Sequence, residues 1–166
     1  MNNPTTDMIK IIFLLGFTLH NLEEAIWLPK WSKYASKYHE PVESNQFVFA
    51  VIVVTILGYF VTVLNLLAGE TNYLFLYIYL GFIGMMGLNS IFPHLLSTIV
   101  LKKYCPGLMT GLLLNLPLAV IIIYHYLKTG INIYYLIIAV VIVSGVILFS
   151  LKYWFRLGKA LIRFPD

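Results

Sequence analysis

Residues 17–29, FTLHNLEEAIWLP, carry three ionisable side chains inside an otherwise apolar run. On a helix, Glu23 follows His20 by three positions and Glu24 follows it by four, so both carboxylates flank the imidazole on one face. An imidazole beside two carboxylates suits the binding of a divalent metal or general acid/base catalysis. Because charged groups are costly in an apolar environment, we expect all three to face inward and to have partners.

Two later segments supply polar partners. The segment GLNSIFPHLL, residues 87–96, contains Asn89 and His94, and YCPGLMTGLLLNLP, residues 104–117, contains Asn115. Each segment also contains a proline, which removes a helical hydrogen bond and is expected to interrupt its helix. The predicted metal ligands are His20, Glu23, Glu24 and His94. The predicted catalytic residues are Glu23, Glu24, Asn89 and Asn115, although hydrogen bonding between helices would explain the two asparagines equally well.

The elements that position these groups follow from the composition. The chain is 60% hydrophobic and 11% charged, whereas soluble domains are about 45–50% apolar and about 25% charged. Five apolar stretches lie at about 8–28, 47–68, 73–100, 108–127 and 132–151, each near the ~20 residues that a membrane-spanning helix needs. We therefore expect an all-α, multi-pass protein of the cell membrane, with residues 1–166 forming one domain. Residues 152–166 are expected to be a short, basic, amphipathic tail on anionic headgroups.

The basic residues predict the orientation. Nine of the eleven Lys and Arg residues lie in 30–37, 102–103 and 152–163, which five spans place on one side. The positive-inside rule puts the N-terminus outside and the C-terminus in the cytoplasm. His20 then lies about 12 Å from the cytoplasmic boundary, whereas Asn65 and His125 are expected to be ordinary residues of the outer interface. The basic residues therefore indicate contact with a membrane and not with nucleic acid.

An ordered set of motifs connects these segments. His20-Asn21-Leu22-Glu23-Glu24 is followed by His94, by Lys102-Lys103, and by Tyr104-Cys105-Pro106-Gly107. In this order the chain resembles the HXXEE family of bacterial and archaeal integral membrane proteins, over roughly residues 10–125. The resemblance implies a shared site but no substrate or activity. Cys105 is the only cysteine, which excludes CxxC metal or redox chemistry.

The first functional hypothesis is a metal-dependent enzyme of the membrane. Two imidazoles and a carboxylate suit Zn²⁺ with an open position, or Fe²⁺. His20, His94 and one glutamate would bind the metal, and the other glutamate would act as a base or orient a ligand. The site lies at the depth of the cytoplasmic leaflet, so the expected partners are the bilayer and a lipid or other hydrophobic small molecule. Hydrolysis is favoured over oxidation.

Three alternatives stay open at this point. A His–Glu pair without a metal suits general acid/base catalysis, as in an isomerase. Intramembrane glutamate and histidine also occur in transporters, proton-linked carriers and binding proteins, although the chain has no internal repeat. A structural subunit would use the same residues to hold helices together. The sequence contains no Gly-rich phosphate loop, GxSxG or HExxH motif, and a homo-oligomer is compatible with it.

Overall fold

The computed structural model describes residues 4–38, 40–69 and 71–162, and the regular structure in these ranges is helical. Five helical units are long and apolar enough to cross a membrane. They run over Pro4–Ala35, Ser44–Ala68, Tyr73–Leu101, Leu108–Lys128 and Ile133–Leu161. The predicted all-α class with five such helices is confirmed.

Three of the five units are assembled from more than one helical piece. The first, second and last units are α1 (Pro4–Ser32) with the 3₁₀ turn η1 (Lys33–Ala35), α2 (Ser44–Ala68) and α7 (Ile133–Leu161). The third unit contains α3 (Tyr73–Asn89), the π-helical η2 (Ser90–Leu95) and α4 (Leu96–Leu101). The fourth contains α5 (Leu108–Thr110), the π-helical η3 (Gly111–Asn115) and α6 (Leu116–Lys128).

The last helix is longer than the sequence suggested. α7 continues without a break to Leu161, past the predicted end at 151, so much of the segment expected to be a separate tail belongs to this helix. Its 29 residues span about 44 Å, more than the ~30 Å hydrocarbon core. Residues 163–166 of the predicted tail lie outside the described ranges.

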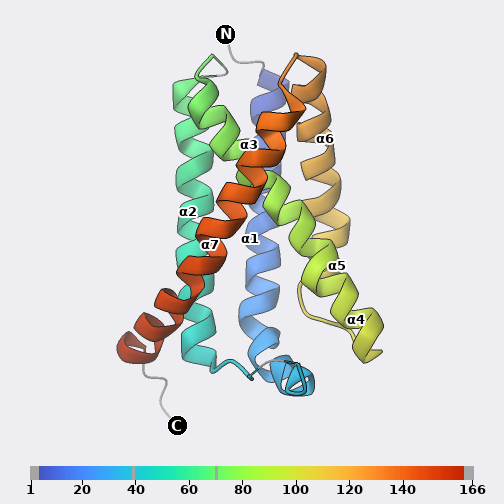
Figure 1. The fold of residues 1–166 in the computed structure, drawn as a ribbon, viewed down its shortest axis with the longest axis vertical. Helices are drawn as coiled ribbons and strands as arrows, with labels where there is room; N and C mark the ends of the chain where they lie inside the picture. The colour runs from blue at the N-terminus through green and yellow to red at the C-terminus, as the bar shows by residue number, and fades with distance from the viewer. Residues whose placement is uncertain (1–3, 39, 70, 163–166) are drawn as a thin grey trace.

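The helices form a bundle in which α3 crosses α7 near the middle (Figure 1). Two glycines of α3 make this crossing close. A Cβ at Gly81 would lie 2.8 Å from the carbonyl oxygen of Ala139, and a Cβ at Gly84 would lie 2.5 Å from Val140. Small residues allow such close packing of membrane helices. Beyond the crossing, towards the C-terminal end of α7, the two helices diverge (Figure 1).

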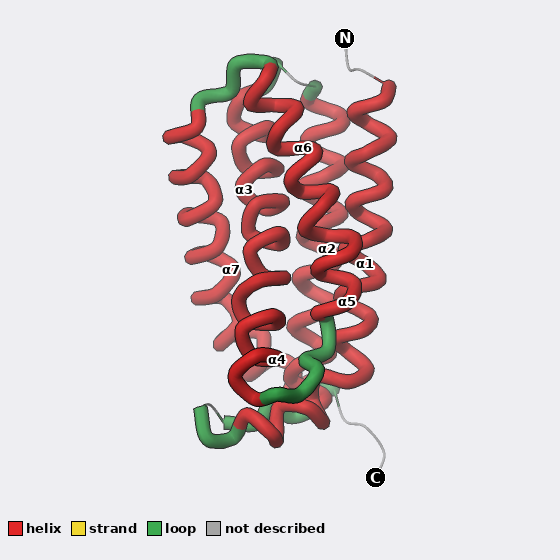
Figure 2. Tube along the Cα trace, turned by 90° about the vertical axis from the view of Figure 1, so that its right-hand side faces the viewer, coloured by secondary structure: helices red, strands yellow, loops and turns green. Residues whose placement is uncertain are grey.

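The described ends of the chain lie at opposite ends of the bundle. The Pro4 end of α1 and the Leu161 end of α7 point in opposite directions in both views (Figures 1 and 2). An odd number of alternating spans requires this arrangement. The assignment of one end to the cytoplasm depends on the charge distribution and remains a prediction.

The two π-helical segments lie where proline was expected to break a helix. In η2, Phe92 has a non-helical backbone (φ −127°, ψ 114°) directly before Pro93. η3 ends one residue before α6, which carries Pro117 in its first turn. A Cβ at Gly111 of η3 would lie 2.9 Å from Ser90 Oγ of η2, so the two irregular segments are in close contact. Single π turns often mark functional sites, and these two face the polar residues of α1.

Candidate metal centre

Two histidines and one glutamate from separate segments meet inside the bundle. His20 and Glu24 lie one turn apart on α1, and His94 comes from η2. Glu24 Oε1 lies 3.6 Å from His20 Nε2 and 2.8 Å from His94 Nε2. Both imidazoles are buried, with exposed fractions of 0% and 1%. The interruption at Pro93 therefore brings His94 to Glu24 of α1, as one of the polar partners expected from the later segments.

The spacing of the three side chains suits one small cation. One donor atom from each residue lies within 4.8 Å of the other two. A tetrahedral zinc ion with bonds of about 2.0–2.1 Å spaces its donor atoms roughly 3.3 Å apart. The two distances to Glu24 lie on either side of that value, and the imidazole rings stand edge to face with centroids 5.0 Å apart. One ion could be held once the donor atoms adjust towards this spacing.

Asn89, at the end of α3, joins the two imidazoles. Its Nδ2 lies 3.2 Å from His20 Nε2 and 3.1 Å from His94 Nε2. An amide nitrogen has two hydrogens to donate and no lone pair to accept with. In this orientation Asn89 requires a lone pair on both Nε2 atoms. A histidine binds a metal through the same lone pair, so a bound ion would replace these two hydrogen bonds.

The other nitrogen of each imidazole has a partner that favours the same tautomer. Thr110 Oγ1 lies 3.2 Å from His20 Nδ1 and donates its own hydrogen to Glu23 Oε2 at 2.7 Å. The hydroxyl oxygen is therefore available to accept from His20 Nδ1–H. Cys105 Sγ lies 3.5 Å from His94 Nδ1, and its hydrogen points to the carbonyl oxygen of Pro106 at 3.7 Å. Metal-binding histidines commonly donate their second N–H in this way.

Glu23 lies outside the group of three donor residues. Its carboxylate accepts hydrogen bonds from the Tyr104 hydroxyl and from the hydroxyl and backbone N–H of Thr110. Through Thr110 it orients the imidazole of His20. Of the two glutamates, Glu24 therefore belongs to the group that could hold an ion, whereas Glu23 contacts His20 only through Thr110.

Asn115 is not joined to this network. Its side chain is fully buried, and neither amide atom has a hydrogen-bond partner in the part of the chain that the structure describes. The predicted catalytic role of Asn115 therefore has no contact to support it. Asn65 is also 0% exposed, so the expectation of an ordinary interface residue is wrong at that position. His125 pairs with Thr6 at 3.3 Å, far along the chain from the centre.

Gly107, in the turn before α5, closes one side of the centre. Its φ of +91° lies in the region that L residues rarely adopt. A Cβ at this position would lie 2.6 Å from His94 Cε1 and 3.0 Å from His20 Cε1. The Pro106-Gly107 turn therefore holds both imidazoles in place, which gives the Tyr-x-Pro-Gly element a physical role.

Sequence reasoning missed two side chains of the same turn. Cys105 was excluded from CxxC chemistry and given no other role, yet its thiol lies against His94. Burial, with smaller contributions from Glu24 and Glu23, raises the pKa of this thiol to about 12. Burial and the bond to Glu23 also raise the pKa of Tyr104. Their position beside the Pro-Gly turn was the available signal.

A cavity of about 580 Å³ adjoins the centre. Glu24, Asn89 and His94 form its polar end, and its walls are mostly apolar side chains of α1, α2, α3, η2 and α7. Sites for small molecules typically measure about 300–1,000 Å³ and combine apolar walls with a few polar groups. The candidate centre can therefore be reached by a molecule of that size.

Comparison with known proteins agrees with the motif. The model of the family described as "Protein of unknown function with HXXEE motif" matches residues 11–122. The chain belongs to the HXXEE family. A relative from Bacillus subtilis (strain 168), "Uncharacterized protein YrkK", is 47% identical over 147 residues, which cover 88% of this chain and 92% of the relative. No solved structure matches the chain significantly. The family's motif supplies His20, Glu23 and Glu24, and the matched region also includes His94 and Gly107.

Proposed function

We propose that this HXXEE protein is a multi-pass membrane enzyme that uses a divalent metal ion held by His20, Glu24 and His94. Its N-terminus lies outside and its C-terminus in the cytoplasm, because the positive-inside rule assigns the basic end of the bundle to that side. The substrate is a lipid or other hydrophobic molecule that reaches the centre at the depth of the cytoplasmic leaflet.

The contact between His94 and Glu24 carries the proposal. Asn89, Thr110 and Cys105 favour lone pairs on the two Nε2 atoms, and a carboxylate oxygen lies only 2.8 Å from one of them. Two acceptors at that distance repel each other unless a proton or a cation lies between them. A divalent cation would bind the two Nε2 atoms and the carboxylate oxygen, and it would offset the carboxylate charge where water is scarce.

The chemistry that such an ion would supply is Lewis acidity and activation of a water molecule. Three protein ligands leave an open position, as in catalytic zinc sites. Glu24, Asn89 and His94 line the cavity, so they would be among the polar residues beside a bound substrate. Glu23 is already engaged by Tyr104 and Thr110 and serves to orient His20. Hydrolysis by a metal-activated water molecule is the reaction that we favour over oxidation.

Elemental analysis of purified protein tests the proposal. We expect one zinc or iron ion per chain in the wild type, and loss of the ion in His20→Ala, His94→Ala and Glu24→Gln. His125→Ala is the matched control, because this histidine pairs with Thr6 and lies outside the centre. A wild-type protein that stays metal-free after dialysis against Zn²⁺ or Fe²⁺, or an ion retained by both histidine variants, contradicts the proposal.

A metal-free acid/base enzyme is the second candidate. The same short contact between His94 and Glu24 favours it, because a proton shared between imidazole and carboxylate would also remove the repulsion. The amide of Asn89 would then present its oxygen to the imidazoles. Metal-free wild-type protein whose His94 has Nε2 protonated, observed by ¹⁵N NMR of labelled histidine, supports this second candidate over the first.

A further inference from the structure

We propose that the 580 Å³ cavity binds a single fatty acyl chain, with its carbonyl or carboxylate oxygens at the candidate centre. The chain enters sideways from the bilayer between η2 and α7. The anchoring of the head rests on the proposed metal centre, whereas the binding of the hydrocarbon chain rests on the cavity itself.

The lining of the cavity determines which polar head group of the ligand fits. Glu24, Asn89 and His94 bring the candidate centre into the lining, where Asn89 can donate hydrogen bonds and a bound cation would accept an oxygen ligand. Among the residues that the structure describes, no Lys or Arg lines the cavity. A phosphate head carries more charge and is usually bound by such residues. An uncharged or singly charged oxygen head therefore fits this end better than a phosphate.

The rest of the cavity determines the kind of tail. Apolar side chains of three helices form its walls: Phe47, Ala50, Val51 and Val54 of α2, Met85 of α3, and Ile147 and Leu151 of α7. Burying a hydrocarbon chain here replaces contact with lipid by contact with protein, so the gain comes from fit and from the head. The volume suits one molecule of small-ligand size, so we expect one chain per protein.

The mouth of the cavity opens through the side of the bundle. Leu88, Phe92 and Leu148 line the cavity and yet are 55%, 69% and 64% exposed. They belong to helical units long and apolar enough to span a membrane. The opening exists because α7 diverges from α3 beyond their crossing (Figure 1) and because the helix is interrupted at Phe92. A ligand therefore reaches the centre through the hydrocarbon region.

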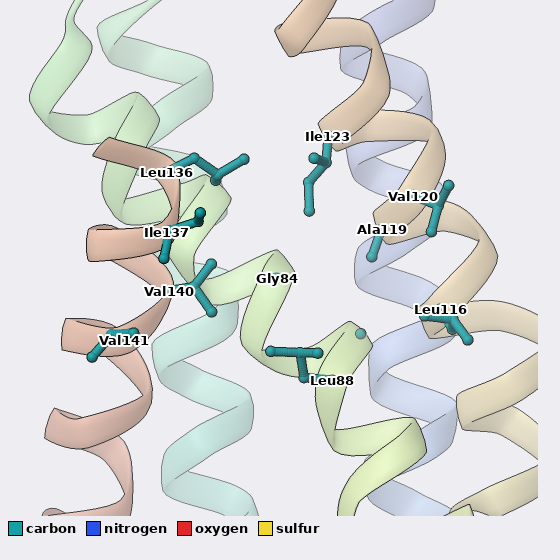
Figure 3. A pocket seen from close by; sticks show the side chains of 11 residues that line it. Gly84, Leu88, Leu116, Ala119, Val120, Ile123, Leu136, Ile137, Val140 and Val141 are labelled. Carbon is teal, nitrogen blue, oxygen red and sulfur yellow. The ribbon is translucent and has the colours of Figure 1, made fainter. Parts of the chain in front are cut away.

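A second crevice lies on the other side of the lower half of α3 and provides the matched comparison. It measures about 380 Å³ and is lined by α3, α6 and α7 (Figure 3). Its lining residues are glycine and aliphatic side chains, including Val140 and Val141, with no polar side chain. Lipid tails can lie there, but it offers nothing to bind a head. A selective fatty acid site should therefore be in the larger cavity.

Photocrosslinking tests this assignment. The probe is palmitate with a diazirine in its chain, added to zinc-loaded protein in phosphatidylcholine vesicles. We expect crosslinks to α2 and to the 144–155 segment of α7, with competition by unlabelled palmitate and at least about tenfold weaker competition by hexadecyl phosphate. Ala50→Phe on α2 and Ser144→Phe on α7 each add a ring to the cavity lining and should each reduce labelling about tenfold or more. Val141→Phe, one turn from Ser144 but facing the other crevice, should label like the wild type.

Zinc content measured on the same samples separates the two proposals. Three results overturn the fatty acyl site. Labelling is equal in all variants, or it maps to the crevice in Figure 3, or hexadecyl phosphate blocks it as well as palmitate does. One zinc per chain with such a result leaves the metal centre intact. Specific labelling of the cavity in protein that binds no zinc overturns the metal centre alone. Two filling variants guard against the misfolding of one of them. Far-UV circular dichroism identifies a variant that retains the wild-type helix content.

Discussion

Replacing Gly107 with alanine adds one methyl group and strains the candidate centre in two ways. The first is in the backbone, because φ is +91° at this position. A residue other than glycine in such a conformation costs about 1–3 kcal/mol. The second is a steric clash, since the new Cβ would lie 2.6 Å from His94 Cε1 and 3.0 Å from His20 Cε1.

The magnitude of the effect on metal binding follows from these distances. Ordinary contact with a Cβ begins near 3.4 Å, so the His94 ring or the turn must retreat from 2.6 Å to that distance. Such a shift exceeds the tolerance of about 0.2 Å for a metal–ligand bond. Disturbing the groups that support metal ligands typically weakens binding about 10–100-fold. We expect Gly107→Ala to weaken zinc binding by at least about tenfold and to lower stability by about 1–3 kcal/mol.

Competition with a fluorescent zinc chelator, using purified protein in detergent, measures the affinity. Gly145→Ala is the control, because a Cβ there meets nothing within 4 Å and the residue lies inside α7. Alanine is favoured over glycine within helices by about 0.5–1 kcal/mol, so this variant should bind zinc normally. The reasoning is refuted if Gly107→Ala binds zinc as tightly as the wild type and Gly145→Ala.

Three further predictions concern the surroundings of the centre and the far end of the bundle. Glu23→Gln should retain one zinc per chain but bind it about tenfold more weakly, because Glu23 acts on His20 through Thr110 and not on the metal; loss of the ion at saturating zinc contradicts this role. Cys105 in folded, metal-free protein should react with iodoacetamide at pH 8 far more slowly than in protein unfolded in SDS, since the thiol is 1% exposed and its pKa is about 12. Folding raises the pKa of the Cys105 thiol from 9.0, so the folded state holds its proton more tightly than the unfolded state does. The free energy of unfolding should therefore fall as the pH rises from about 9 towards 12. Equal alkylation rates in folded and unfolded protein contradict the burial of the thiol. Asp7→Asn should destabilise the protein by about 1–3 kcal/mol, because Lys10 is fully buried and pairs with Asp7 at 3.3 Å. Adding Lys10→Met should recover much of the lost free energy of unfolding in an SDS titration. A double variant as unstable as Asp7→Asn contradicts the pairing.

Periodicity and composition were sufficient for the helices but not for their interruptions. Long apolar stretches specify membrane-length helices because only helices satisfy the backbone there. Proline positions predicted where the third and fourth units break. The π-helical form of η2 and η3 depends on contacts between them, such as Gly111 against Ser90, which have no local signal.

The candidate site was predictable to the level of residue type and depth. His20, Glu24, Asn89 and His94 meet, as expected of polar partners from separate segments. The separation of Glu24 from Glu23 depends on which carboxylate meets Tyr104 and Thr110, and only the fold determines this. Burial was the least predictable property, because Lys10 and Asn65 lie near helix ends and yet are fully covered by neighbouring helices.

Zinc K-edge X-ray absorption spectroscopy of the zinc-loaded wild-type protein tests the central claim most directly. The proposed centre predicts two imidazole nitrogens and carboxylate oxygen at about 2.0–2.2 Å. It also predicts no sulfur at about 2.3 Å, because the Cys105 thiol contacts His94 Nδ1 and not the Nε2 atom proposed to bind the metal. A sulfur shell, a spectrum without imidazole scattering, or protein that binds no zinc contradicts a centre built from His20, Glu24 and His94.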